Sequence, residues 1–128
     1  MSKEDNPLPI YDFKKGAVLL VNKPIGWTSF DVVNKLRFAI KKKLGIKKIK
    51  VGHAGTLDPL ATGLLIICTG KFTKQLDEYQ GLQKTYTGTL KLGATTPSYD
   101  AETEIDSTYP IDHITHELLE EKRTLFLG

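Results

Sequence analysis

Apolar residues are concentrated in short runs, and the spacing within each run indicates the element it forms. Two uninterrupted runs, residues 17–21 and 64–68, have the length and character of buried β-strands. Residues 85–92 instead alternate apolar and polar positions, which predicts a strand with one face in solvent. Turn-forming residues at positions 22–26 end the first run. The pattern therefore predicts three strands.

A helical pattern follows this turn, because apolar side chains recur every three or four residues up to Gly45. Ser29 can cap the start of that helix, and Gly45 can end it. Residues 71–79 predict a short second helix. Thr115 opens a third helix that ends at Gly128. Two sets of apolar residues are expected to face inward from the first and third helices: Val33, Leu36, Ile40 and Leu44, and Leu118, Leu119, Leu125 and Phe126.

The order of these elements indicates the fold class. Strands and helices are interspersed without a regular strand–helix–strand rhythm, which predicts an α+β fold with a mixed, mainly antiparallel sheet and helices packed on it. At 128 residues the chain has the usual size of one domain. Residues 1–15 lack periodicity and are expected to form a loose N-terminal arm, and residues 93–98 a turn.

Composition limits the class of protein. With 40% hydrophobic and 26% charged residues, the chain can bury a core. No apolar run approaches the ~20 residues that cross a bilayer, and the N-terminus lacks a secretory signal, so we expect a cytoplasmic protein with no membrane partner. The single cysteine, Cys68, lies in an apolar run and is assigned to the core. Together with the three histidines it has no zinc-ligand spacing, so no metal site is expected.

Charge is segregated along the chain. Residues 1–50 contain 12 Lys and Arg against 4 Asp and Glu, whereas residues 51–128 contain 6 against 11. A basic half favours a polyanionic partner such as nucleic acid, because neutralised phosphates release counterions. Lysines at the end of a helix also stabilise its dipole and keep a protein soluble, so both interpretations stay open. The densest cluster comprises Lys41, Lys42, Lys43, Lys47, Lys48 and Lys50.

A glycine-rich stretch, residues 51–63, has neither helical nor strand periodicity and contains Asp58 before Pro59. Pro59 biases Asp58 toward an extended backbone, and the glycines allow close approach of a ligand. A carboxylate held in this way can act as nucleophile, general base or electrostatic stabiliser, with His53 nearby as a hydrogen-bonding group. The alternative is a simple Asp-Pro turn with a solvated side chain.

The order of three motifs is similar to that of a known family. Residues 16–24 with Gly26, Thr28 and Ser29 come first, followed by the Gly-His-x-Gly-x-Leu-Asp-Pro-x-Ala-x-Gly block at 52–63. A Lys-Thr-Tyr strand at 84–86, a Leu-Gly pair at 92–93 and Asp100-Ala101-Glu102 complete the match. Across most of residues 16–107 the chain resembles the TruB-type tRNA pseudouridine synthases.

The resemblance implies a reaction and a fold. The family isomerises a tRNA uridine, typically at position 55 of the T loop, to pseudouridine without a cofactor or metal. The bond from ribose C1′ to base N1 is broken, and C1′ is joined to C5. Asp58 would be the essential carboxylate; whether it attacks the ribose, adds to the base or removes a ribose proton stays open. Residues 16–128 would form the N-terminal part of a pseudouridine synthase catalytic domain.

The resemblance also implies substrate-binding residues. The reacting nucleotide must leave the loop stack, at a cost of a few kcal/mol. Tyr86 matches the tyrosine that stacks on the flipped base, and such stacking is worth ~1–3 kcal/mol. His53 matches a histidine near the displaced nucleotides. Lys23 matches a lysine close to the active site that serves phosphate binding or structure, and Asp100 is assigned to the substrate side. The expected partner is the T-arm stem-loop of tRNA, bound by a monomer.

Departures from the family pattern raise a second hypothesis. Asn22, Ala54 and Pro97 differ from the residues that the family often has. Family members continue past the point that corresponds to Gly128, into a segment with an arginine that pairs with the catalytic aspartate and a second tyrosine. The chain is therefore expected to be a C-terminally incomplete portion of the catalytic domain. The alternatives to an enzyme are a truncated tRNA-binding module or RNA chaperone, and a nonfunctional piece made soluble by its lysines.

Overall fold

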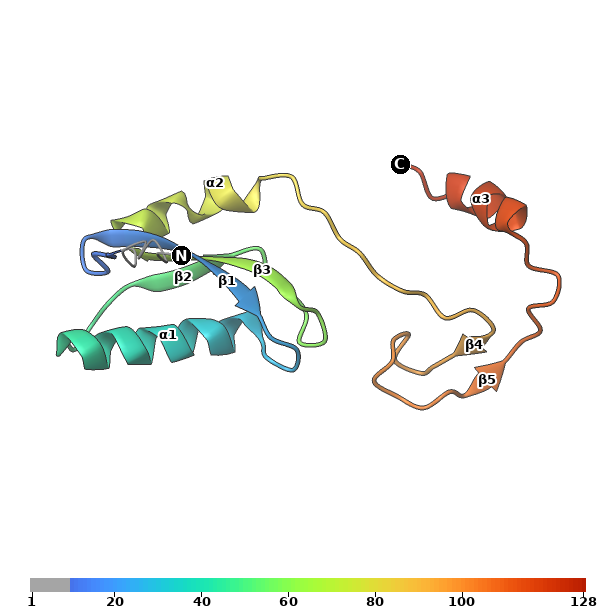
Figure 1. The fold of residues 1–128 in the computed structure, drawn as a ribbon, viewed down its shortest axis with the longest axis horizontal. Coiled ribbons are helices and arrows are strands. Elements are labelled where there is room, and N and C mark those ends of the chain that lie inside the picture. The colour runs from blue at the N-terminus through green and yellow to red at the C-terminus, as the bar shows by residue number, and fades with distance from the viewer. Residues whose placement is uncertain (1–9) are drawn as a thin grey trace, which may run out of the picture. The chain divides into compact units, whose positions relative to one another are not determined.

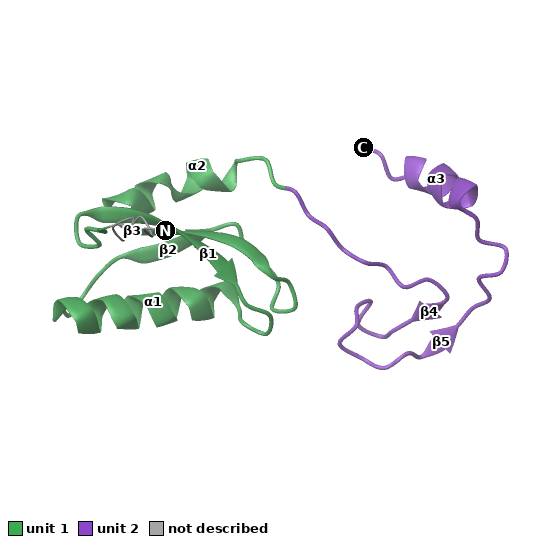
Figure 2. Cartoon of the chain, in the orientation of Figure 1, with its two compact units in different colours: residues 1–84 green, residues 85–128 purple. Residues whose placement is uncertain are grey.

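The computed structural model describes residues 10–128, which divide into two compact units (Figures 1 and 2). The first unit runs to Lys84, and the second comprises residues Thr85–Gly128. Of the predicted N-terminal arm, residues 1–9 lie outside the described part. Residues 13–15 form a turn directly before the first strand. Each unit is considered by itself below.

The first unit is built on a three-stranded antiparallel sheet. Its strands are β1 (Gly16–Lys23), β2 (Val51–Ala54) and β3 (Gly63–Gly70), in the order β1-β3-β2. The two apolar runs predicted as strands are confirmed as β1 and β3, and both are longer than predicted. β2 corrects the prediction for the start of the glycine-rich stretch, which was expected to lack strand structure. Its four residues are too few to produce a visible alternation.

The pairing register shows which residues lie at each end of the β1–β3 strand pair. Gly16 pairs with Gly70 at one end, and Lys23 pairs with Gly63 at the other. His53 of β2 lies opposite Ile67 of β3. The glycine-rich loop between β2 and β3 therefore leaves the sheet at the Lys23 end.

Helix α1 (Ser29–Leu44) covers one face of the sheet. Its N-cap is Thr28, not Ser29 as predicted: the Thr28 hydroxyl accepts from the Asp31 N–H, and the Asp31 carboxylate accepts from the Thr28 N–H. This reciprocal pair is a capping box, and the signal was present in the sequence as Thr-x-x-Asp. Gly45 ends the helix in the left-handed conformation with φ 62°, as predicted.

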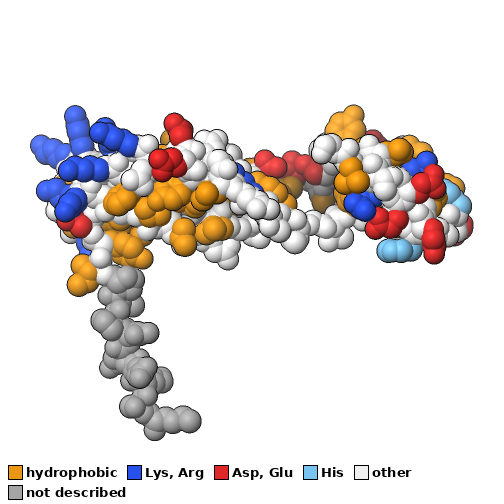
Figure 3. Space-filling view, turned by 90° about the horizontal axis from the view of Figure 1, so that it is seen from above, with side chains coloured by type: hydrophobic (Ala, Val, Ile, Leu, Met, Phe, Trp, Pro, Cys, Tyr) orange, Lys and Arg blue, Asp and Glu red, His pale blue; other side chains and the backbone are white. Residues whose placement is uncertain are grey.

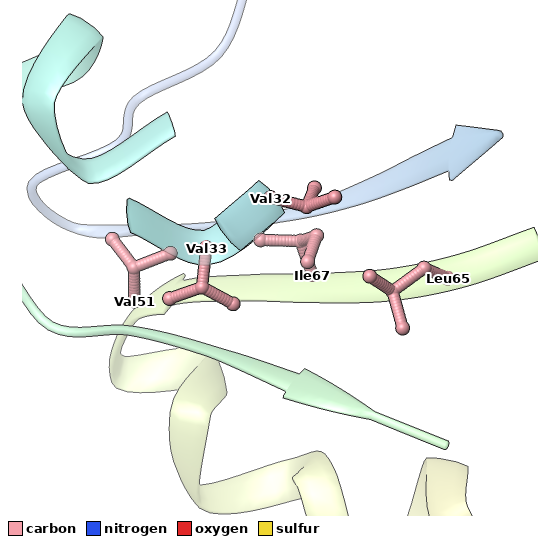
Figure 4. Close-up of a cluster of buried hydrophobic side chains, with 5 residues drawn as sticks. All are labelled: Val32, Val33, Val51, Leu65 and Ile67. Carbon is pink, nitrogen blue, oxygen red and sulfur yellow. The ribbon is translucent and has the colours of Figure 1, made fainter. Parts of the chain in front are cut away.

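The core lies between α1 and the sheet. Figure 4 shows Val32 and Val33 of α1 against Val51, Leu65 and Ile67 of the strands. All five are buried, and each contributes about 1.5–3 kcal/mol relative to an exposed side chain. Of the four residues expected to face inward from α1, Val33 and Ile40 are buried, Leu36 is half-buried and Leu44 is exposed.

The opposite face of the sheet carries the short helices η1 (Lys71–Gln75) and α2 (Leu76–Gln80) (Figure 1). Together they confirm the helix predicted at residues 71–79. Leu76 approaches Gly52 so closely that a Cβ there would lie 2.7 Å from it, which explains a glycine in this strand. Cys68 is buried as predicted, and this burial raises the pKa of its thiol.

The second unit has little regular structure. It contains the two-residue strands β4 (Ala94–Thr95) and β5 (Ser107–Thr108), which pair with each other, and helix α3 (His116–Thr124). The strand predicted at 85–92 is wrong: this stretch forms no strand and pairs with no segment of the described chain. An alternating pattern creates a strand only when a neighbour satisfies its backbone groups.

Helix α3 confirms Thr115 as the N-cap, because its hydroxyl accepts from the Leu118 N–H. The helix ends at Thr124, earlier than predicted. Leu119, Leu125 and Phe126 are 44%, 73% and 87% exposed, so the expected inward face is wrong for these three residues, and Leu118 is half-buried. No side chain of α3 is buried. Helical spacing predicts which residues share a face, but burial also requires a surface to pack against.

Within residues 10–128, no helix is long and apolar enough to span a membrane. No group of three or more His, Cys, Asp or Glu side chains is arranged to hold a metal ion there.

Candidate active site

Asp58 lies in the loop between β2 and β3, and its side chain is exposed. The Asp58 carbonyl accepts from the Ala61 N–H at 2.9 Å, which closes a β-turn with Pro59 at its second position, where the fixed φ of proline is favoured. Gly55 and Gly63 flank the loop with φ of 77° and 146°, backbone conformations that glycine adopts readily. The local sequence thus fixes the backbone that carries the carboxylate.

The residue before Asp58 is anchored to the start of α1. The Leu57 N–H donates to the Ser29 hydroxyl at 3.0 Å, and this hydroxyl donates to the Leu57 carbonyl at 3.3 Å. Ser29 is buried, so both hydrogen bonds are shielded from water. The sequence pattern predicts a capping role for Ser29 and does not reveal this contact. The one signal for it is that a second hydroxyl residue follows the N-cap, Thr28.

The residue after Asp58 is anchored to the turn that follows β1. The Pro59 carbonyl accepts from the Gly26 N–H at 2.7 Å and from the Lys23 ammonium at 3.3 Å. Gly26 has φ 83°, so the turn depends on a glycine at this position. Asp58 is therefore held through the backbone of both neighbours, while its own carboxylate makes no hydrogen bond within the described residues.

Lys23 occupies an unusual position for a lysine, because its side chain has no exposed surface. Its ammonium donates to three carbonyl oxygens, those of Pro24 at 3.0 Å, Trp27 at 2.6 Å and Pro59 at 3.3 Å. These bonds use all three of its donors. Of the two roles left open by the sequence, phosphate binding and structure, the contacts favour structure.

His53 lies on β2, the strand that leads into the Asp58 loop, and is partly buried. Its Nδ1 atom is buried and has no hydrogen-bond partner within residues 10–128. A buried nitrogen without a hydrogen-bond partner costs free energy. The structure thus places His53 and Lys23 in the same unit as Asp58.

Tyr86 and Asp100 belong to the second unit and are described within that unit alone. Tyr86 is 71% exposed and belongs to no helix or strand. The Asp100 carboxylate accepts from the Ser98 hydroxyl at 2.5 Å and from the Glu102 N–H at 2.9 Å, and these two bonds lower its pKa. The Asp100 carboxylate is thus hydrogen-bonded within its own turn. It stays ionised to a lower pH than the carboxylate of an ordinary aspartate.

The fold and the loop define an α+β module that presents the exposed Asp58 carboxylate on a backbone held by hydrogen bonds to both neighbouring residues. Comparison with known proteins identifies the class. The sequence profile of the TruB family pseudouridylate synthase (N terminal domain) matches residues 41–128. The chain therefore belongs to the TruB family, which confirms the resemblance seen in the sequence.

Individual relatives agree with this assignment. The chain is 64% identical to the tRNA pseudouridine synthase B of Bacteroides thetaiotaomicron over 117 residues, which are 91% of this chain and 49% of that protein. It is 64% identical to the protein of the same name from Phocaeicola vulgatus, with 91% and 50% covered. For the Flavobacterium johnsoniae protein the identity is 59%, with 91% and 52% covered. The chain spans about half the length of the curated relatives it matches.

Proposed function

We propose that this chain carries the catalytic carboxylate of a tRNA pseudouridine synthase, and that this carboxylate is Asp58. The enzyme would isomerise a uridine of tRNA, at position 55 of the T loop, to pseudouridine. Membership of the TruB family and the names of the relatives support the reaction class. The observation that carries the residue assignment is the anchoring of Leu57 and Pro59 on either side of an exposed Asp58.

The chemistry fits a single carboxylate. The glycosidic bond between C1′ and N1 breaks, a bond between C1′ and C5 forms, C5 loses its proton and N1 gains one. Atoms and charge balance within the nucleoside, so neither an oxidant nor a cofactor is required. Asp58 can attack C1′, add to the base or remove a ribose proton, and each role needs a carboxylate at a fixed place beside the sugar.

The proposal also assigns roles to four other residues of the chain. Tyr86 offers an exposed ring on which the flipped base stacks, which offsets part of the unstacking cost. His53, on the strand that leads into the Asp58 loop, is assigned to the nucleotides displaced from the tRNA loop. Lys23 is a positioning residue that acts on Asp58 through the Pro59 carbonyl. Asp100 contributes on the substrate side through the turn that its carboxylate stabilises. The protein would work as a monomer in the cytoplasm, without a metal.

The test uses this chain joined to the part of the Bacteroides thetaiotaomicron relative that the match leaves uncovered, hereafter the extended chain. Unmodified tRNA transcripts carrying tritium at C5 of uridine are the substrate, because each isomerisation releases that tritium to water. The extended chain should release it. Asp58→Asn should lower the rate at least ~1,000-fold while tRNA affinity changes little, because the amide is neither base nor nucleophile.

The matched control is Asp112→Asn, which alters an exposed aspartate of the second unit and should leave the rate unchanged. An Asp58→Asn protein with full activity would refute the catalytic assignment. An extended chain that binds tRNA but releases no tritium would favour the alternative, a tRNA-binding module or RNA chaperone without catalytic activity.

A further inference from the structure

Eight basic residues line one open hollow of about 750 Å³ in the first unit, here called the basic hollow. Lys47, Lys48 and Lys50 come from the loop after α1, and Arg37 and Lys41 come from α1 itself. Figure 3 shows Lys and Arg side chains gathered at the end of the unit where α1 ends. Lys42 and Lys43, which belong to the cluster seen in the sequence, do not line the hollow.

Three further lysines join the hollow from segments that the sequence pattern did not connect with it. Lys14 precedes β1, and Lys71 and Lys74 belong to η1. The lining therefore comes from both sides of the sheet and from stretches of chain about 60 residues apart, such as Lys14 and Lys74. No local charge run predicts such a convergence, because tertiary structure creates it.

Backbone hydrogen bonds hold these segments together at the Gly70 end of β3. The Gly70 N–H donates to the Lys50 carbonyl at 3.0 Å, and the Lys71 N–H donates to the Lys15 carbonyl at 3.1 Å. Gly70 has φ 57°, and a Cβ there would lie 2.8 Å from the carbonyl oxygens of Lys14 and Lys15. Only glycine fits this junction without displacing the backbone. The hollow is thus part of the fold and does not arise from a flexible tail.

The charges in the hollow are not neutralised within the described chain. Its lining contains no Asp or Glu, and the one ion pair found among residues 10–128 joins Arg123 to Glu120 in the second unit. Arg37 is fixed in place, because it donates to the Asn34 side chain at 2.8 Å and to the Val51 carbonyl at 3.1 Å. These bonds use two of its five donors, and the remaining three are available for an anion. Such a concentration of one sign raises the local concentration of polyanions.

The basic hollow lies at the opposite end of the sheet from Asp58. Gly70 lines the hollow and pairs with Gly16, whereas the Asp58 loop is anchored to Lys23, at the other end of β1. The eight residues of β1 span about 23 Å at ~3.3 Å per residue. A ligand in the hollow therefore does not contact Asp58, and an RNA that reaches both must do so with different nucleotides.

We propose that the basic hollow binds the sugar–phosphate backbone of the RNA substrate at a place remote from the reacting nucleotide. This inference rests on the proposed function for the identity of the polyanion. Seven of the eight cations are lysines, mobile point charges that suit phosphates without reading sequence. The hollow is open and wide, which fits a continuous row of phosphates better than one enclosed anion.

The test compares two triple variants with the same change in charge. Lys48→Gln, Lys71→Gln and Lys74→Gln together remove three cations of the hollow. The control removes three exposed lysines outside it, Lys35, Lys91 and Lys122, by the same substitution. Binding of an unmodified tRNA transcript is measured for the 128-residue chain and for the extended chain. The salt concentration is varied from about 50 to 200 mM, a range over which phosphate contacts change the affinity strongly.

The hollow variant should bind tRNA roughly tenfold or more weakly near physiological salt, and the slope of log affinity against log salt should fall by about 2–3. The control should change much less. In the extended chain the loss should appear as a higher KM, with kcat at saturating tRNA within about twofold of the parent, because the hollow lies far from Asp58. Equal losses in the two variants would overturn the proposal.

A second measurement needs no variant and so does not depend on folding. Lysine acetylation of the parent chain is followed by mass spectrometry with and without tRNA. Bound tRNA should protect Lys48, Lys71 and Lys74 but not Lys35, and the absence of such a difference would count against the hollow. If the extended chain binds tRNA through the hollow yet forms no pseudouridine, the proposed function fails and this inference stands. If the extended chain forms pseudouridine but tRNA does not protect the lysines of the hollow, this inference fails and the proposed function stands.

Discussion

The two ends of the β1–β3 strand pair are built in opposite ways. At the Lys23 end, backbone groups on both sides of Asp58 are hydrogen-bonded to Ser29, Gly26 and Lys23, and the Asp58 carboxylate is exposed. At the Gly70 end, the backbone is equally fixed, but it carries long, exposed cationic side chains. The Lys23 end fixes the backbone that carries the Asp58 carboxylate, and the Gly70 end presents positive charge.

This difference corresponds to what each task requires. Chemistry at a sugar carbon depends on placement to within a fraction of an ångström, because misplacement by 1 Å can cost about 100-fold in rate. Attraction of a polyanion depends on the number of charges and tolerates mobile side chains. Substitutions that disturb the backbone should therefore affect stability at both ends, whereas loss of a side-chain charge should matter for stability only at the Lys23 end.

Lys23→Met gives the largest expected effect. Methionine fills the space of the lysine stem but leaves the carbonyls of Pro24 and Trp27 without this donor, and the Pro59 carbonyl keeps only the Gly26 N–H. We expect the free energy of unfolding to fall by about 3–5 kcal/mol, measured by urea denaturation. Lys35→Met, at an exposed position of α1, should change it by less than ~0.5 kcal/mol. Equal effects for the two would remove the contrast between the buried ammonium and the surface lysines.

Gly70→Ala tests the backbone of the other end. The new Cβ would meet two carbonyl oxygens at 2.8 Å in a conformation that L residues avoid, so we expect a loss of about 2–3 kcal/mol in unfolding free energy. Gly88→Ala is the control, since nothing lies within 4 Å of its Cβ. Differential scanning calorimetry of both variants gives the answer. A Gly70→Ala protein as stable as the parent would show that the junction adapts.

Ser29→Ala sharpens the comparison at the Asp58 end. It leaves the Leu57 N–H and carbonyl without their partner and should cost about 1–3 kcal/mol. In the extended chain kcat should fall about 10- to 100-fold with little change in KM, because the carboxylate is displaced while RNA contacts persist. Thr28→Ala, which removes the helix cap next to it, should cost about 1 kcal/mol and leave kcat nearly unchanged. A rise in KM alone would argue against positioning.

Asp31→Asn gives the smallest effect, and its size depends on pH. The pKa of Asp31 is lowered from 3.8, chiefly because the Thr28 backbone N–H donates to its carboxylate, with the Thr28 hydroxyl contributing less. A lowered pKa stabilises the folded state above pH 3.8, and this contribution disappears as the pH falls through the folded-state value. The difference in unfolding free energy between parent and variant should therefore be constant near neutral pH and shrink under acid conditions. A difference that grows on acidification contradicts the capping box.

Local pattern predicted the first unit well and the second poorly. The apolar runs that became β1 and β3 and the helical spacing of α1 agree with the structure, because each segment packs against another within the same unit. Residues 85–92 have an equally clear alternation but form no strand, since nothing in the described chain pairs with them. Periodicity shows which side chains of a segment could be buried together. They are buried only where a neighbouring segment packs against them.

The sequence proposed residues for the candidate site but not the connections between them. The glycine-rich stretch singled out Asp58 and His53, and the family resemblance added Lys23. The link between Lys23 and the Pro59 carbonyl spans 36 positions, and no sequence signal predicts it. The same applies to Lys14 and Lys71, which local charge counting did not group with the other lysines of the hollow. Contacts between distant segments depend on register and on turn geometry, which one sequence does not display.

The buried ammonium of Lys23 has a consequence for how an RNA would be selected. If the Asp58 loop moved away from the sheet, the buried Lys23 ammonium would lose its hydrogen bond to the Pro59 carbonyl, and no water could replace it. We therefore expect the loop to keep its conformation when an RNA binds. Nearly all of the rearrangement then falls on the nucleic acid. Loops whose target nucleotide is already loosely stacked would react fastest, and rigid duplexes of the same sequence would be bound and released unchanged.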